Sequence, residues 1–173
     1  NGAVTLTAQA SMTVHSAIAA GAGDILRLES VNENLEIVDP GAGQAAAIRA
    51  DGFALVAEDR IVSYDFFQGP KLIEYRASGF DFEFPLDLAA DSIIIESGET
   101  ISIGGSLSAV DRVELVSDAN VFVGGDIAGL NGTLAELVIR ATGINAVTSS
   151  VFDANTGLRA FSQVGSGKTV LFD

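Results

Sequence analysis

The stretch DSIIIESGETISIGGSLSAVDRVELVSDANVFVGGDIAG, residues 91–129, decides the fold. It contains one motif twice, in DSIIIES and DRVELVS: an Asp, then apolar residues at alternate positions, then a Ser or Ala, here Ser in both copies. A second apolar pair follows each motif at the same offset, Ile101 with Ile103 and then Val121 with Val123. Alternation of this kind over three to five residues predicts short strands with one buried face.

The motif recurs outside this stretch. DILRLES and DGFALVA fit it fully, and KLIEYRA and AELVIRA fit it with the first residue changed. Strands that repeat at similar intervals with constant internal offsets are typical of a solenoid, in which each strand stacks on its equivalent in the next coil. An antiparallel sandwich gives no reason for such constant offsets. The first apolar positions of the successive copies, used here as markers, are Val4, Leu26, Phe53, Ile73, Ile93, Val113 and Leu137.

These repeats predict an all-β chain that forms one right-handed parallel β-helix over residues 1–173, with about seven to eight coils. Each coil should rise by one strand spacing, about 4.8 Å, and the right hand is the usual one for parallel crossovers. The markers should face inward and stack as apolar columns. The residues between them should face solvent, among them Arg27, Glu29, Glu74, Arg112 and Glu114.

Glycine pairs stand at the same place in two repeats, Gly104–Gly105 and Gly124–Gly125. They fall in the gap before the third apolar position of each repeat, Leu107 and Ile127. We expect the chain to turn sharply there or to need a positive φ, which glycine adopts without steric cost.

Two regions, residues 38–51 and 66–91, break the repeat and are expected to form irregular loops. In the second, Phe80, Phe82 and Phe84 lie one position out of register with the other copies. Insertions in a solenoid often form loops on one face, commonly the face that binds a ligand. Alternatively, the three rings pack the inside of a bent coil.

Composition excludes several classes of function. Hydrophobic residues make up 48% of the chain and charged residues 18%, a balance that argues against intrinsic disorder. Nine Lys and Arg against 23 Asp and Glu give a net charge of −14, which disfavours nucleic acid and anionic lipid as partners. We expect no membrane insertion, because no apolar run approaches the length of a membrane span. The chain has no Cys and one His, His15, so thiolate and multi-histidine metal sites are absent.

Carboxylates are the candidates for chemistry. Asp91 and Asp111 occupy the same repeat position, so their carboxylates should lie near one strand spacing apart. They are weak candidates for a structural Ca²⁺ site, and the alternative is that they cap turns. Asp81 with Glu83, or Asp87 with Asp91, could form the acid pair of a glycosidase. The acids are spread evenly along the chain with no His or Arg cluster beside them, so we expect no enzyme, no catalytic residue and no other cofactor.

Residues 91–129 resemble the GxLxLxAGGxIxxxGxLxAxGxVxLxA repeats of filamentous haemagglutinin-like adhesins and autotransporter passengers. Residues 4–30 resemble them moderately, and the middle of the chain resembles them in period alone. The resemblance implies a long right-handed β-helix that is secreted or held at the bacterial cell surface. No NPNG-type motif of the export module occurs, so the chain would correspond to shaft.

The function expected from this resemblance is that of a rigid structural or adhesive segment of an extracellular surface fibre or exoprotein. The chain begins without Met or a signal peptide, so we expect a processed form or a piece of a longer protein. Its partners would be neighbouring coils of the same protein, or identical subunits at ends left open by the stacked strands, and surface glycans. The alternative is a secreted carbohydrate-binding or polysaccharide-degrading β-helix with its cleft in residues 66–91.

Overall fold

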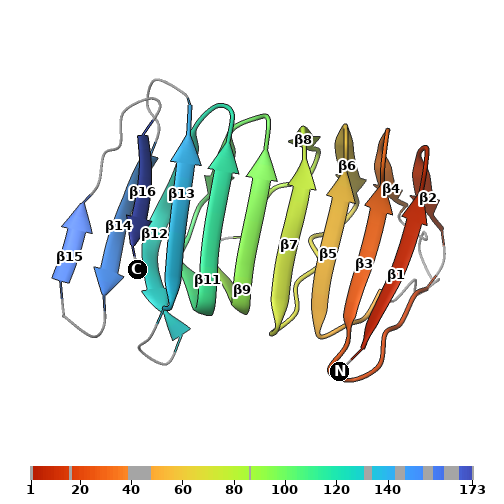
Figure 1. The fold of residues 1–173 in the computed structure, drawn as a ribbon, viewed down its shortest axis with the longest axis horizontal. Coiled ribbons are helices and arrows are strands. Elements are labelled where there is room, and N and C mark those ends of the chain that lie inside the picture. Colours follow the sequence, from red (N-terminus) through yellow and green to blue (C-terminus); the bar gives the residue numbers. More distant parts are fainter. Residues whose placement is uncertain are drawn as a thin grey trace.

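A computed structural model describes residues 2–15, 17–38, 48–85, 87–130 and 134–142, and the strands at 147–153, 158–161 and 168–172. The chain is all-β, and its parallel strands stack as a β-solenoid of about 6 turns (Figure 1), close to the predicted seven to eight. The described residues form no α-helix, so none of them belongs to a helix able to cross a membrane. Of the region 38–51, residues 39–47 lie outside the described part.

The motif strands form one long wall of the solenoid. Neighbouring strands in this wall are paired in parallel, each with the copy before and the copy after it. In chain order they are β1 (Ala3–Ala8), β3 (Ile25–Ser30), β5 (Gly52–Ala57), β7 (Leu72–Ala77), β9 (Leu88–Ser97), β11 (Leu107–Ser117) and β13 (Glu136–Ala141).

A second set of strands follows the motif strands around the coil. Four of them form a separate parallel sheet in the order β2–β4–β6–β8, behind the first wall in Figure 1. Two later strands, β10 and β12, pair with each other in parallel. The bounds are β2 (Met12–Val14), β4 (Leu35–Ile37), β6 (Arg60–Ser63), β8 (Gly79–Phe80), β10 (Ile101–Ile103) and β12 (Val121–Gly129).

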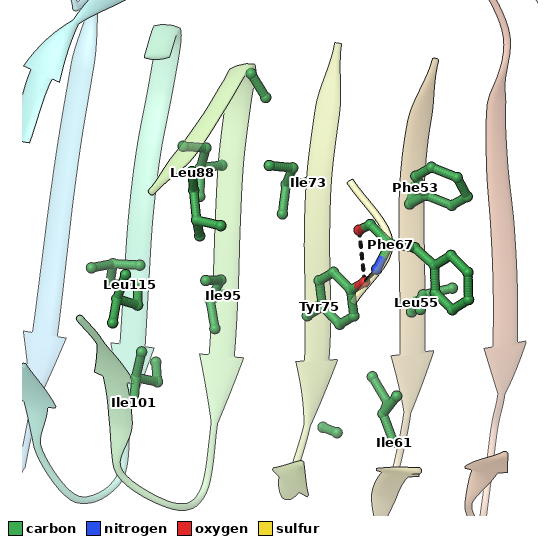
Figure 2. Close-up of a cluster of buried hydrophobic side chains, with 14 of the residues drawn as sticks. Phe53, Leu55, Ile61, Phe67, Ile73, Tyr75, Leu88, Ile95, Ile101 and Leu115 are labelled. Atoms are coloured by element: carbon green, nitrogen blue, oxygen red, sulfur yellow. Dashed lines mark hydrogen bonds between the residues drawn. The ribbon is translucent and has the colours of Figure 1, made fainter. Parts of the chain in front are cut away.

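The predicted register is confirmed. Each marker pairs with the marker of the next coil, from Val4 with Leu26 through to Val113 with Leu137. The second and third apolar positions also stack, Ile101 on Val121 and Leu107 on Ile127. The markers from Leu26 to Leu137 are all buried, so their column is a continuous apolar ladder. Figure 2 shows two of them, Phe53 and Ile73, among other buried side chains of the core.

Serine ends the motif because the chain turns there in a buried corner. Ser30, Ser97 and Ser117 are all buried. The Ser30 hydroxyl donates to the carbonyl of Ala10 at 2.7 Å, and the Ser117 hydroxyl donates to the carbonyl of Glu99 at 2.8 Å. Serine fits this position because its side chain is small and its hydroxyl hydrogen-bonds to a main-chain carbonyl in the turn of the preceding coil. Buried polar groups without such a partner are costly.

The glycine pairs serve close approach between coils, and the predicted positive φ is wrong for them. Gly124 and Gly125 lie inside β12, and among the described glycines only Gly23 has a positive φ, 86°. A Cβ on Gly124 would lie 2.4 Å from the carbonyl oxygen of Gly104 in the coil before it. The corners of consecutive coils therefore pack backbone on backbone.

The two ends of the stack differ. At the N-terminal end, β1 and β2 are the first strands of their sheets, and both pair in parallel with the next coil. At the other end the parallel pattern stops: β13 pairs with β16 (Lys168–Phe172) and β14 (Val147–Asp153) pairs with β15 (Leu158–Phe161), both antiparallel. The expectation that both ends leave parallel strands open is therefore wrong for the C-terminal end. The antiparallel strands there also account for the smaller number of turns.

Candidate functional site

The second sheet is interrupted between β8 and β10. Pairing ends where Phe80 lies opposite Ile61, and within the described strands β10 pairs with β12 alone. The residues one period before Ile101 and Ile103 are Asp81 and Glu83. If this segment stacked in the regular register, the two carboxylates would occupy the inward positions of Ile101 and Ile103. A shift by one residue moves a strand's side chains to the opposite face, so the shifted segment places Phe rings inward instead. The shifted register of the Phe residues thus explains the break.

Aromatic rings fill the coil at the break. Phe66 stacks on Tyr75 with ring centroids 4.9 Å apart and an angle of 15° between the rings. Phe82 lies 5.2 Å from Tyr75, and Phe82 and Phe84 lie 5.4 Å apart with tilted or edge-on geometry. Such offset and edge-on contacts are the favourable ones for aromatic pairs. The three out-of-register rings therefore pack a bent coil, the second of the two predicted interpretations.

Tyr75 anchors this cluster. Its side chain is fully buried, and its hydroxyl donates to the carbonyl of Phe67 at 2.7 Å and accepts from the amide of Phe67 at 2.8 Å. Figure 2 shows Tyr75, on β7, pointing at Phe67 with both hydrogen bonds drawn. Burial raises the pKa of the Tyr75 hydroxyl, so it stays protonated and holds the loop that contains Phe67.

A groove of about 410 Å³ opens beside the cluster. Its volume falls in the range of small-molecule sites, about 300–1,000 Å³. Its lining combines half-buried aromatic rings, two carboxylates and three hydroxyl groups, so it could contact an apolar face of a ligand and hydrogen-bond to polar groups on its edge. The lining residues are Phe80, Phe82, Glu83, Phe84, Ser97, Glu99, Thr100, Ser102 and Gly104.

Arg60 bridges the break at the rim of this groove. Its guanidinium donates to the carbonyl of Phe80 at 2.8 Å and forms an ion pair with Glu99. It passes over Gly79, where a Cβ would lie 2.6 Å from a guanidinium nitrogen. Arg60 and Gly79 are partners in the β6–β8 ladder, and Glu99 lies one period after Gly79, so the bridge joins three consecutive coils.

The outward face of the long wall carries a network of ion pairs. The guanidinium of Arg76 lies 2.8 Å from the carboxylate of Glu74 and also pairs with Glu96. Arg112 lies 2.9 Å from Glu114. The predicted outward orientation of Glu74, Arg112 and Glu114 is confirmed, but the Glu74 and Glu114 side chains are only 14% and 12% exposed. Charged residues here hold neighbouring coils together as well as facing water.

The predicted acid pairs do not come together in the groove. Of Asp81 and Glu83, only Glu83 lines it, and the Asp81 carboxylate accepts a hydrogen bond from the amide of Ser63 at 2.8 Å. The Asp87 carboxylate accepts from the amide of Ser106 at 2.8 Å. Asp81 and Asp87 therefore cap backbone groups of adjacent coils. His15 is exposed on the first coil.

Asp91 and Asp111 lie where β9 and β11 lose register. The pairing shifts between Ala109 and Arg112, so Asp91 and Asp111 both lie within an irregular step of the ladder. The described residues contain no group of three or more His, Cys, Asp and Glu suited to a metal. Ca²⁺ takes six to eight oxygen ligands. Two carboxylates would leave most of that shell to water.

In two earlier copies of the motif, the first residue, Asp24 or Asp51, caps a turn. The Asp24 carboxylate accepts from the amide of Gly2 at 2.6 Å, and the Asp51 carboxylate accepts from the amide of Gly23 at 2.7 Å. Each acceptor therefore belongs to the coil after its donor. This gives the motif Asp a structural role between coils.

Sequence reasoning located the irregular coil but missed the groove wall at 97–104 and the Arg60 bridge. The available signal was their spacing: Arg60, Gly79 and Glu99 lie about one period apart, so they occupy equivalent places in three consecutive coils. Compared with known proteins, the chain matches no family model, no curated protein and no solved structure.

Proposed function

We propose that this chain is a rigid structural segment, without catalytic activity, of an extracellular bacterial surface fibre or exoprotein. The observation that supports it best is the unbroken column of markers from Val4 to Leu137, buried from Leu26 onward. Stacked coils of this kind contact only their neighbours and extend in one direction, as a spacer requires. The resemblance of residues 91–129 to the repeats of surface fibres supports the extracellular location and the adhesive role in this proposal.

The location is tested by protease treatment of intact cells that produce the protein, followed by mass spectrometry of the released peptides. We expect peptides from the exposed corners of the coils to be released before lysis, together with those of a known surface protein. A cytoplasmic protein serves as the control for lysis. Release only after the cells are broken would refute the extracellular assignment.

The groove beside Phe82 and Phe84 favours carbohydrate binding as a second function. Its apolar rings could pack against a sugar face, and Glu83, Glu99 and the lining hydroxyls could accept or donate hydrogen bonds to sugar hydroxyls. This arrangement would give a rod that also adheres to surface glycans.

Isothermal titration against a panel of neutral oligosaccharides tests this second function. Binding should be lost in Phe82→Ala and weakened in Glu99→Gln, and retained in Glu58→Gln, a change of the same chemistry outside the groove lining. Circular dichroism of each variant checks that the coil survives. Binding that is unaffected by Phe82→Ala and Glu99→Gln would exclude the groove, and breakdown of the glycan would contradict the absence of catalysis.

A further inference from the structure

The main chain of β10 is unpaired on the side that faces the break. The amide of Ile101 donates to the carbonyl of Asn120 at 2.9 Å, so Ile101 directs its main-chain groups at β12. Main-chain groups alternate in direction along a strand, and those of Ser102 therefore point the opposite way, toward the break. Among the described residues, neither the N–H nor the C=O of Ser102 has a hydrogen-bond partner.

These two main-chain groups face the groove beside the aromatic cluster. Ser102 is exposed and lines this groove, as do Thr100 and Gly104, the residues two positions away on either side. On the β8 side, the carbonyl of Phe80 already accepts from the guanidinium of Arg60 at 2.8 Å. The groove thus combines aromatic rings with an open main-chain edge that offers a fixed donor and a fixed acceptor.

The charges of the lining favour a neutral ligand. The described lining residues include the carboxylates of Glu83 and Glu99 but no Lys or Arg. These carboxylates and the net charge of −14 disfavour acidic sugars. Glu99 is already paired with Arg60, and Glu83 is exposed, where an ion pair contributes little. A cationic ligand therefore gains little here, and hydrogen bonds and apolar contact should decide selectivity.

We propose that the groove selects sugars that carry an acetamido group, the N-acetylated hexosamines. An acetamido group presents a C=O, an N–H and a methyl group. Its C=O would accept from the N–H of Ser102, and its N–H would donate to the carboxylate of Glu83 or to a hydroxyl of the lining. Its methyl group would pack on the rings of Phe82 and Phe84. The inference rests on the glycan binding proposed above and names the class of sugar.

Isothermal titration with tetramers of N-acetylglucosamine, glucose and glucosamine, all with the same linkage, tests the proposal. The three ligands differ in one substituent, which is an acetamido group, a hydroxyl or an amine. The acetylated tetramer should bind at least about tenfold more tightly than the glucose tetramer, because it adds an amide hydrogen bond and a buried methyl group. It should also bind more tightly than the amine.

Each other result of this titration has a definite meaning. Equal affinity for the acetylated and glucose tetramers would overturn the inference and leave glycan binding in place. Tighter binding of the amine would assign the selectivity to the charge of Glu83 and would also overturn it. No binding of any tetramer would overturn both the inference and the glycan binding on which it rests.

A matched pair of variants at Ser102 tests the main-chain contact. Ser102→Pro removes the N–H that faces the groove and leaves the ladder to β12 in place, because that ladder uses Ile101 and Ile103. Ser102→Ala removes the hydroxyl and keeps the N–H. The preference for the acetylated tetramer should disappear in Ser102→Pro and persist in Ser102→Ala, with circular dichroism as the check on folding. A preference that survives Ser102→Pro would overturn the assigned contact.

Amide hydrogen exchange of the unaltered chain gives a second readout that does not require the proline variant to fold. Without ligand, the Ser102 amide should exchange rapidly and the Ile101 amide slowly. Saturation with the acetylated tetramer should slow exchange at Ser102 at least about tenfold, and saturation with the glucose tetramer should slow it less. A Ser102 amide that is protected without ligand, or that responds equally to both tetramers, would contradict the proposal.

Discussion

Replacing Tyr75 with Phe removes a single oxygen from the centre of the aromatic cluster. That oxygen forms two hydrogen bonds to the main chain of Phe67, and the site is fully buried. The substitution leaves one buried N–H and one buried C=O without partners, and each such group costs about 1–3 kcal/mol. We therefore expect Tyr75→Phe to lower the free energy of unfolding by about 2–6 kcal/mol at pH 7.

The same substitution should change how stability depends on pH. Burial raises the pKa of the Tyr75 hydroxyl in the folded chain, whereas an unfolded Tyr titrates near a pKa of about 10. Above that pH the unfolded chain loses a proton that the folded chain keeps, so the stability contributed by the neutral hydroxyl is complete below about pH 10 and is lost as the pH rises. The loss amounts to about 1.4 kcal/mol per pH unit.

Urea denaturation followed by circular dichroism at pH 7, 10 and 11 measures both effects. The difference in unfolding free energy between the original chain and Tyr75→Phe should be largest at pH 7 and should narrow above pH 10, because the variant has no hydroxyl to ionise. The rest of the chain is identical in the two proteins and cancels in the comparison. A difference below about 1 kcal/mol at pH 7, or one that does not narrow, would refute the assigned role of the hydroxyl.

Three further predictions concern the stack. Ile93→Ala, in the buried marker column, should lower the free energy of unfolding by about 2–5 kcal/mol, measured by urea denaturation. Ile94→Ala, on the outward face, should lower it much less, and equal losses would contradict the assigned faces. Gly124→Ala should lower the melting temperature because its Cβ meets a carbonyl at 2.4 Å, whereas Gly2→Ala, whose nearest contact is a flexible carboxylate at 3.3 Å, should be tolerated. Arg76→Gln should lower the free energy of unfolding by about 1 kcal/mol at low salt and by less in 1 M NaCl. A loss of stability that salt leaves unchanged would argue against the ion pairs.

The parallel stack could be predicted because inward positions alternate and repeat at fixed offsets. The markers pair as predicted even across the 27-residue interval between Leu26 and Phe53, since an insertion in a loop leaves the buried columns intact. The antiparallel end could not be predicted from alternation, which indicates a strand without its direction. The short connection between Asp153 and Leu158 was the available signal, because parallel crossovers need a dozen residues or more.

The candidate site was predictable only in part. The Phe residues out of register mark the coil where stacking fails. The expectation of irregular loops over residues 66–91 is too broad, because β7 and the start of β9 lie within that range and β7 pairs regularly on both sides. The other wall of the groove comes from Ser97 to Gly104, residues with a regular pattern of their own. They line a groove only because the preceding coil leaves their side uncovered, which is a property of two coils together. The guanidinium bridge from Arg60 to Glu99 depends likewise on the absence of a side chain at Gly79.

The break between β8 and β10 also bears on how the solenoid opens. On either side of it the coils share two walls, but across it the long wall alone is continuous, through β7 and β9. Neighbouring coils are the cooperative partners in a repeat protein, so a boundary with fewer shared hydrogen bonds divides the chain into separate foldons. We expect amide exchange to report two protection levels that change near residue 81, and mechanical extension from the ends to release the chain in two steps.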